Sequence, residues 1–266
     1  MSLTHGSGPF GDRPAGRFNR RIDPEGLLYL EESPKWIRAR FAGETVADSR
    51  NPRILHEHQR LPAFYFPPED VRMDLLRESG HTETDPVKGE RTSYTLEVDG
   101  RTAEDAASAF AGEPLIEGLV TLRWDAMDEW LEEEEPLFGH TRDPYSRIDV
   151  RDTSRHVRVS IGGETVAEST RAKVLFEAGL PPRWYFPRED VRMELLVDSD
   201  RQTTCAYKGF ASYWSVGEED DIAWTYEDPL HDALPVQGLV AFFNERVDLE
   251  VDGEPVERPH TQWSRD

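Results

Sequence analysis

The sequence predicts a mainly β protein made of two similar small antiparallel β domains, barrel- or sandwich-like, arranged as a pseudo-two-fold pair. Two observations predict this fold. The chain of 266 residues repeats its own motifs at one spacing, and within a copy short apolar runs alternate with glycine and proline about every ten residues. Because this spacing is much longer than the roughly 20–50 residues of a solenoid repeat, each copy is long enough to be a domain.

The repeat has an offset of 120 residues (163 − 43 = 120), seen first in GETVA at 43–47 and 163–167. Further motifs recur at this offset in the same order: YFP at 65–67, EDVRM at 69–73, LL at 75–76, KG at 88–89 and GLV at 118–120. A match of Ser93-Tyr94 with Ser212-Tyr213 is displaced by one residue, which predicts a small deletion. Duplicated domains often keep the interface of an ancestral homodimer, so we expect the two copies to pack on each other.

The domain boundaries follow from the repeat and from composition. We place a polar N-terminal arm at 1–29, a first and degenerate domain at 30–135, a linker at 136–149, a second domain at 150–252 and a tail at 253–266. The arm is rich in glycine, proline and arginine and lacks the apolar stretch of a signal peptide.

The strands are clearest in the second copy, where Val157, Val159 and Ile161 alternate with polar residues, as in a half-buried strand. The pair at 162–163, two glycines, predicts a hairpin turn. The segment Glu189-Asp190-Val191, with two acidic residues shortly after Pro187, predicts a single helical turn. Further strands are expected at 165–169, 173–176, 183–186, 193–197, 209–216, 222–226, 239–243 and 247–251. In the first copy, 124–134 predicts a helix.

From the net charge of −22 we expect neither nucleic acid nor an anionic membrane as a partner, because both are negatively charged. An anionic ligand would need a locally basic pocket. The single cysteine leaves no intramolecular disulfide and no cysteine-rich zinc site, and we expect no metal and no cofactor. No apolar run reaches the roughly 18 residues of a membrane span, so a cytoplasmic location is the default expectation.

A series of motifs in the second copy carries a family resemblance. YFP-x-EDVR is followed by CAYKG at 205–209, ASYW at 211–214, AWTY at 223–226 and DP at 228–229. In this order and spacing they resemble the DUF427 family, an uncharacterised family also known under a nucleotidyltransferase-like label. The resemblance covers about 200 residues as two copies and implies a β-rich fold. A polymerase-β-type nucleotidyltransferase needs a Gly-Ser turn followed by an Asp-x-Asp pair that holds two metals, and no such arrangement is present.

Lysine usage points to candidate site residues. The chain has four lysines against 27 arginines (31 − 4 = 27), yet Lys88 and Lys208 occupy equivalent positions. Glu57 and Glu177 also correspond. Lys208 could anchor an anion or act as a basic or nucleophilic amine, with Glu177 as its proton partner. The alternatives are a lysine whose stem packs on tyrosines and a structural ion pair.

Cys205 lies three residues before Lys208 and could act as a thiolate beside a cation, or pack as a small apolar residue. The candidate catalytic residues are therefore Lys208, Glu177 and Cys205. The candidate ligand-binding residues are Tyr207, Tyr213, Trp224, Tyr185 and Arg192.

The aromatic candidates could line a pocket, although most such rings belong to a core. Arg192 could instead form a local salt bridge. His56 and His58 would face the same side of a strand, which is compatible with a metal, but we interpret them as surface residues.

Three functions remain open at this point. The leading hypothesis is a domain that binds a small molecule or anion in a pocket of the second copy. One alternative is an enzyme that uses Lys208 or Cys205. The other is a structural protein that presents an acidic face to a partner.

Overall fold

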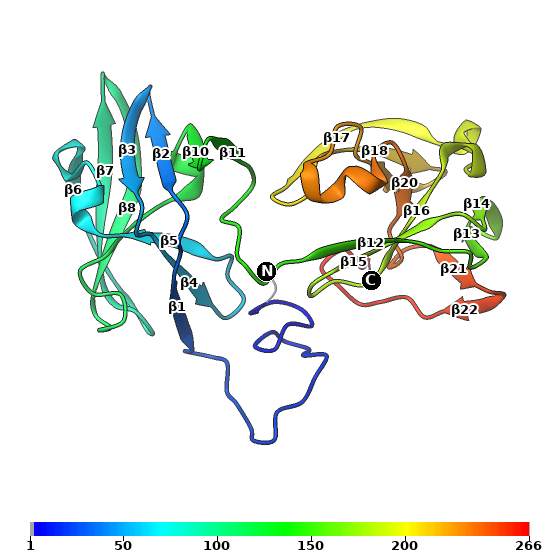
Figure 1. The fold of residues 1–266 in the computed structure, drawn as a ribbon, viewed down its shortest axis with the longest axis horizontal. Coiled ribbons are helices and arrows are strands. Elements are labelled where there is room, and N and C mark those ends of the chain that lie inside the picture. The colour runs from blue at the N-terminus through cyan, green and yellow to red at the C-terminus, as the bar shows by residue number, and fades with distance from the viewer. Residues whose placement is uncertain (1–2, 266) are drawn as a thin grey trace. The chain divides into compact units, whose positions relative to one another are not determined.

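The computed structural model describes residues 3–265 of the chain, which divides into two compact units at residues 143 and 144 (Figure 1). The expected packing of the two copies on each other stays a prediction. Both domains are mainly β and antiparallel, and both contain a seven-stranded and a four-stranded sheet. The predicted fold class of two similar antiparallel β domains is confirmed.

In the first domain the seven-stranded sheet has the order β1-β4-β5-β9-β8-β7-β6 and the four-stranded sheet the order β11-β10-β2-β3. Its strands are β1 (Leu28–Glu32), β2 (Ile37–Phe41), β3 (Glu44–Ser49), β4 (Arg53–Glu57), β5 (Ala63–Phe66), β6 (Leu76–Asp85), β7 (Gly89–Val98), β8 (Arg101–Gly112), β9 (Val120–Leu122), β10 (Glu129–Glu132) and β11 (Glu135–Leu137).

The second domain repeats this arrangement, with orders β12-β15-β16-β20-β19-β18-β17 and β14-β13-β21-β22. Its strands are β12 (Ile148–Asp152), β13 (Val157–Ile161), β14 (Glu164–Ser169), β15 (Lys173–Glu177), β16 (Arg183–Phe186), β17 (Val197–Cys205), β18 (Gly209–Val216), β19 (Glu219–Thr225), β20 (Val240–Phe242), β21 (Asp248–Val251) and β22 (Glu254–Val256).

Side chains of both sheets share one core in the second domain. Val157 and Leu249 come from the four-stranded sheet, and Tyr185 and Phe242 from the seven-stranded sheet, and all belong to one buried cluster. Within residues 3–265 neither sheet closes on itself, so the domain is sandwich-like and not a closed barrel. In the first domain a second, smaller cluster of Leu55, Tyr65, Phe110 and Ile116 lies apart from the main core.

The hairpin turn at Gly162 and Gly163 is confirmed. It joins β13 and β14, and both glycines have positive φ, 58° and 82°, which the tight turn requires.

The helical turn predicted at 189–191 is the 3₁₀ turn η4 (Arg188–Asp190), and the first domain has its equivalent, η1 (Pro68–Asp70). The other 3₁₀ turns are η2 (Met73–Leu75), η3 (Trp124–Ala126), η5 (Met193–Leu195) and η6 (His231–Val236).

The helix predicted at 124–134 is wrong. The segment forms η3 and then β10, which pairs with β2 and β11. Trp130 of β10 stacks on Trp124 with ring centroids 4.8 Å apart and packs against Phe64 and Phe66. Cross-sheet packing of this ring therefore overrides the helical propensity of the glutamate run.

The strand predicted at 193–197 is also misplaced. Residues 193–195 form η5, and β17 begins at Val197 and continues to Cys205. β17 is an edge strand whose residues are mostly polar and exposed, so it lacks the apolar alternation that identifies a strand.

The one-residue displacement of Ser93-Tyr94 has no counterpart in the strand register. Glu78 pairs with Tyr94 and Asp198 pairs with Trp214, so the offset of 120 holds along β7 and β18. The deletion lies further on, in the hairpin between β18 and β19, so that the offset is 116 between β8 and β19 and returns to 120 at β9 and β20.

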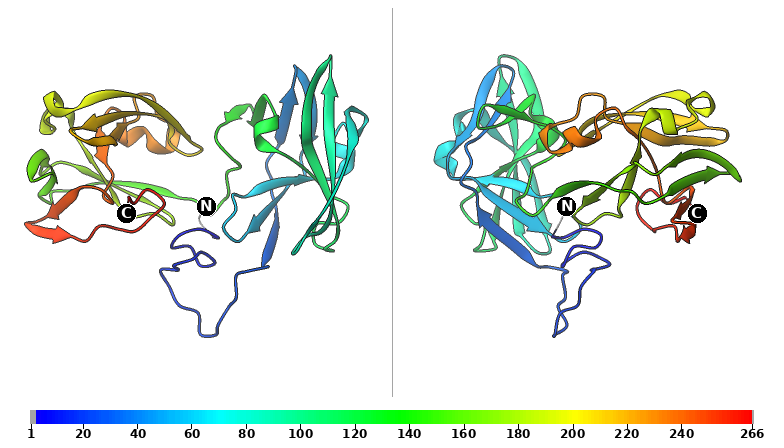
Figure 2. Two further views of the ribbon diagram at one scale, coloured as in Figure 1. Left: turned by 180° about the vertical axis from the view of Figure 1, so that it is seen from behind. Right: turned by 45° about the vertical axis from the view of Figure 1, so that its right-hand side comes forward.

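From residue 3 to residue 27 the N-terminal segment forms turns and loops without strands, as its course in Figure 2 shows. It contacts the β4–β5 turn, where Gln59 donates its backbone N–H to Thr4 and its side-chain amide to Asp12. Across residues 3–265 the structure contains no helix of the length and apolarity that a membrane span requires.

Candidate functional site

Each domain buries one lysine against one glutamate. Lys208 Nζ pairs with Glu177, and Lys88 Nζ pairs with Glu57 Oε2 at 2.7 Å. The two lysines are 8% and 6% exposed, so neither pair is a surface ion pair. The predicted proximity of Lys208 and Glu177 is confirmed.

The backbone places each pair in the same way. The glutamates end β4 and β15, and the lysines lie in the turn before β7 and β18. Gly89 and Gly209 follow the lysines with φ of 86° and 95°, a region that favours glycine. At Gly89 a Cβ atom would lie 2.2 Å from the carbonyl oxygen of Ala111, so this turn admits no side chain.

The environment keeps Lys208 charged. Burial alone lowers the pKa of its ammonium, but Glu177, Cys205 and Tyr185 outweigh burial and raise the pKa above its ordinary value. An amine that stays protonated is a poor nucleophile and a good anchor for negative charge. Cys205 ends β17 as a free, partly exposed thiol.

The aromatic candidates are packed in the second domain. Trp224 Nε1 donates a hydrogen bond of 3.2 Å to Tyr185 Oη, and their rings meet edge to face with centroids 6.2 Å apart. Tyr213 Oη bonds Thr203 Oγ1 at 2.7 Å. Tyr207, Tyr213, Trp224 and Tyr185 are all at most 8% exposed. A pocket in this domain, and a reaction on Lys208, Glu177 or Cys205, stay predictions.

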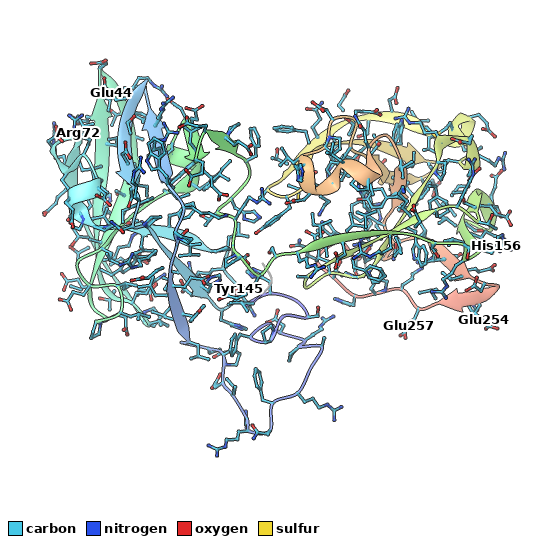
Figure 3. The ribbon with its side chains drawn as sticks, in the orientation of Figure 1. Glu44, Arg72, Tyr145, His156, Glu254 and Glu257 are labelled. Carbon is cyan, nitrogen blue, oxygen red and sulfur yellow. The ribbon has the colours of Figure 1, made fainter. Side chains whose placement is uncertain are left out.

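Arg192 makes its contacts with acidic residues and not with the aromatic candidates. It is exposed and pairs with Glu164 at 2.7 Å and with Glu194 at 3.0 Å, which fits the local salt bridge considered from the sequence. Its equivalent Arg72 pairs with Asp74 at 2.7 Å and lies at the surface of the first domain (Figure 3).

The interpretation of His56 and His58 as surface residues does not fit their contacts in the structure. His56 is 3% exposed, and its Nε2 lies 2.7 Å from Glu31 Oε1. His58 Nδ1 lies 2.8 Å from the carbonyl oxygen of Phe10 in the N-terminal segment. Among residues 3–265 no three histidine, cysteine or acidic side chains group as metal ligands would.

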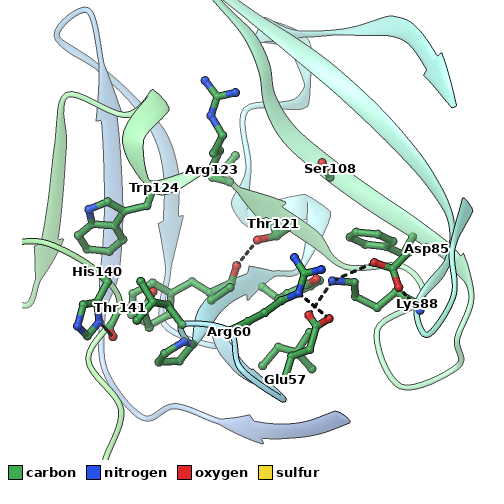
Figure 4. A pocket seen from close by; sticks show the side chains of 18 of the residues that line it. Glu57, Arg60, Asp85, Lys88, Ser108, Thr121, Arg123, Trp124, His140 and Thr141 are labelled. Carbon is green, nitrogen blue, oxygen red and sulfur yellow. Dashed lines mark hydrogen bonds and ion pairs between the residues drawn. The ribbon is translucent and has the colours of Figure 1, made fainter. Parts of the chain in front are cut away.

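The first domain contains a cavity of about 590 Å³ beside its lysine–glutamate pair (Figure 4). Lys88, Glu57, Arg60 and Asp85 gather at one side in the view, and Trp124, His140 and Thr141 lie at the other. Residues that line the cavity include Leu55, Glu57, Arg60, Ala63, Tyr65, Glu83, Asp85, Lys88, Arg91, Ser108, Phe110, Arg123 and Thr141.

Strand register identifies what occupies the same place in the second domain. Tyr65 pairs with Thr121 and Thr121 with Ser108, while Tyr185 pairs with Ala241 and Ala241 with Trp224. Residues opposite each other on neighbouring strands face the same side of a sheet. Ser108 is therefore the equivalent of Trp224.

A second large side chain is missing beside Ser108. Ala63 pairs with Leu55 as Arg183 pairs with Leu175, so Ala63 is the equivalent of Arg183. The Arg183 guanidinium makes a bidentate pair with Glu245 at 2.6 and 2.7 Å, and its centre lies 5.7 Å from the Trp224 ring. The cavity thus adjoins two positions where the second domain carries large side chains.

Charged residues surround the cavity where the second domain has apolar ones. At the offset of 120, Arg60, Arg91 and Arg123 correspond to Leu180, Ala211 and Phe243. With Lys88 they make four cations, against the three acids Glu57, Glu83 and Asp85. In a chain with 53 acidic and 31 basic residues, this reverses the overall balance of charge.

Tyr65 differs from its equivalent Tyr185 in hydrogen bonding. It is 3% exposed and lines the cavity, and within residues 3–265 its hydroxyl has no hydrogen-bond partner. Burial, with the nearby charges of Glu57 and Asp85, raises the pKa of this phenol well above its ordinary value. The hydroxyl is therefore neutral and available to a molecule in the cavity.

The repeat also continues beyond the two predicted domains. His140-Thr141 recurs as His260-Thr261 at the same offset (260 − 140 = 120), a signal present in the sequence that the motif search missed. Thr141 is 3% exposed and lines the cavity, and Thr261 donates to Glu245 Oε1 at 2.6 Å. The linker and the tail each contribute to the domain that precedes them.

Comparison with known families agrees with this duplication. A family model described as a domain of unknown function, DUF427, matches the chain twice, at residues 29–133 and 149–253. No curated protein matches the chain. The two matches cover most of the sequence, and the chain belongs to the DUF427 family as a tandem pair of its domains.

Proposed function

We propose that the protein binds a small organic acid in the cavity of its first domain. The observation that carries the proposal is the replacement of Trp224 and Arg183 by Ser108 and Ala63, beside a buried lysine. A volume of about 590 Å³ lies within the usual range of ligand sites.

The cations around the cavity support an anionic ligand. Lys88 is already balanced by Glu57 at 2.7 Å and Asp85 at 3.4 Å. Arg60 reaches Glu57 at 3.0 Å and Arg91 Nε donates to Ser108 Oγ at 2.9 Å. Each arginine carries five N–H donors, so these contacts leave donors that can meet a carboxylate.

The site favours binding over nucleophilic chemistry in this proposal. The lysine amine is held in an ion pair, and a side chain that is already hydrogen-bonded positions a ligand more readily than it attacks one. The apolar wall of Leu55 and Phe110 faces the ligand's hydrocarbon part, as in most small-molecule sites.

Isothermal titration calorimetry with a set of monocarboxylic acids tests the proposal. Wild-type protein should bind at least one acid, and Ser108→Trp, which places the second domain's residue in the cavity, should bind none. Phe210→Trp is the control, because Phe210 is 52% exposed in the second domain. The proposal fails if no acid binds, or if binding survives in a folded Ser108→Trp protein.

A further inference from the structure

We propose that the acid in this cavity is an indole-type acid, a flat bicyclic aromatic ring with an N–H donor, lying where the Trp224 side chain lies in the second domain. The inference rests on the proposed function and specifies its ligand. The second domain serves as an internal template, because it shows which groups fill the same space on the same strands.

The position of the ring follows from the register. The row Tyr65, Thr121, Ser108 in the first domain matches the row Tyr185, Ala241, Trp224 in the second. In the second row an indole covers the sheet beside the tyrosine, with centroids 6.2 Å apart. In the first row Ser108 leaves this place open and Tyr65 lines it.

A comparison of Tyr65 with Tyr185 indicates a hydrogen bond from the ligand's N–H group to the Tyr65 hydroxyl. Tyr185 Oη accepts the indole N–H of Trp224 at 3.2 Å. Tyr65 is 3% exposed, against 0% for Tyr185, and within the described part of the chain its hydroxyl has no hydrogen-bond partner. A ligand ring with an N–H group would restore in the first domain the hydrogen bond that Trp224 and Tyr185 make in the second.

The ring walls are also retained. Leu55 is buried and lines the cavity, and Phe110, which also lines it, takes the position of Tyr226 at the offset of 116. The Lys88 ammonium lies 5.1 Å from the Phe110 ring centroid, which places the cation and the aromatic wall in contact. Both parts of an aromatic acid therefore meet matching groups.

Three arginines at the cavity indicate that the ligand carries an acid group. Arg60 and Arg123 are exposed at the cavity, and Arg91 reaches Ser108, the residue that replaces the tryptophan. The second domain has Leu180, Phe243 and Ala211 at these positions, and the guanidinium beside its indole, that of Arg183, is already paired with Glu245 of the same domain. The added cations distinguish a free acid from a tryptophan side chain.

Titration calorimetry with indole-3-acetate, naphthalene-1-acetate and cyclohexylacetate tests the inference on the full chain. Indole-3-acetate should bind about five-fold more tightly than naphthalene-1-acetate, because only indole donates a hydrogen bond. Cyclohexylacetate should bind more weakly than both. Tyr65→Phe should remove the difference between the two aromatic acids, and Tyr185→Phe, the matched control in the second domain, should leave it unchanged.

A second pair of variants tests the acid group. Arg60→Leu and Arg123→Phe place the second domain's residues at exposed positions, so the domain should fold, and each should weaken indole-3-acetate binding several-fold. Arg72→Ala, an exposed arginine outside the cavity, should not change it.

The outcomes separate this inference from the proposed function. Equal affinity for the three acids, or an unchanged ratio in Tyr65→Phe, would overturn the indole assignment while an acid site remains. Binding of none of the three, with binding of another acid, would do the same. Binding of no acid at all would overturn both.

Discussion

Ser108 occupies in the first domain the strand position that Trp224 occupies in the second, opposite Thr121 and Ala241 respectively. The two domains share sheet orders and the buried lysine–glutamate pair, and at this position they differ by a whole indole ring. This difference makes each domain the natural reference for experiments on the other.

Trp224→Ser should destabilise the second domain by about 3–5 kcal/mol, because it leaves a cavity and removes the partner of Tyr185. In calorimetry the transition of the second domain should fall on the order of 10 °C. Ser108→Ala in the first domain is the matched control and should change stability by about 1 kcal/mol or less. Equal shifts for the two variants would contradict the packing role of Trp224.

Glu177→Gln should lower the free energy of unfolding of its domain more than Glu57→Gln does. Glu177→Gln leaves the Lys208 ammonium buried without a carboxylate partner among the described contacts, at a cost of about 3 kcal/mol. After Glu57→Gln, Lys88 still has Asp85 at 3.4 Å, so we expect about 1–2 kcal/mol. Urea denaturation measures both, and a larger cost for Glu57→Gln would show that Asp85 does not support Lys88.

Stability should fall as the pH rises above about 10. Burial raises the pKa of Tyr185 to about 12, while an unfolded tyrosine ionises near pH 10. The unfolded chain therefore loses this proton first, so the folded state holds more protons and stability decreases between about pH 10 and 12. The raised pKa of Lys208 acts in the same direction, because its ion pair is lost as the amine deprotonates.

Tyr185→Phe tests this alkaline dependence. The variant should show a shallower loss of unfolding free energy with pH, by up to about 1.4 kcal/mol per pH unit within the window. Tyr145→Phe, at a residue 37% exposed, is the control and should keep the wild-type slope. An unchanged slope in Tyr185→Phe would mean that this phenol titrates alike in the folded and unfolded chain.

Gly89→Ala should destabilise more than Gly209→Ala. Both residues have positive φ, which costs about 1–2 kcal/mol for a residue with a Cβ atom. At Gly89 the added atom would also meet the Ala111 carbonyl at 2.2 Å, whereas at Gly209 the nearest atom lies at 3.3 Å. Equal unfolding free energies for the two variants would show that β8 shifts to admit the methyl group.

The repeat predicted much of the fold and part of the site. Motifs at one offset gave the two domains, and the scarcity of lysine pointed to Lys208 and its partner Glu177, which do lie together. The predicted helix at 124–134 failed because Trp130 is fixed by rings on distant strands. The edge strand β17 was misplaced because its exposed polar residues carry no periodic signal.

The cavity was harder to anticipate. From the sequence, aromatic residues indicated a pocket in the second copy, since rings can line a ligand site. In the structure Tyr185 and Trp224 fill space in the core, and the described cavity lies in the first domain beside Ser108. Cavity formation depends on side chains that are absent, and recognising Ser108 as the equivalent of Trp224 required the register across β19 and its four-residue deletion.

The burial of two of the four lysines has a practical consequence for chemical labelling. Amine-reactive reagents need an accessible, deprotonated amine, which leaves Lys35 and Lys173, with side chains 39% and 30% exposed, as the reactive lysines of the native protein. Acylation at Lys88 or Lys208 would then report opening of a domain. Each domain carries one such lysine, so peptide mapping of the acylated sites over time would measure the opening rate of each domain separately.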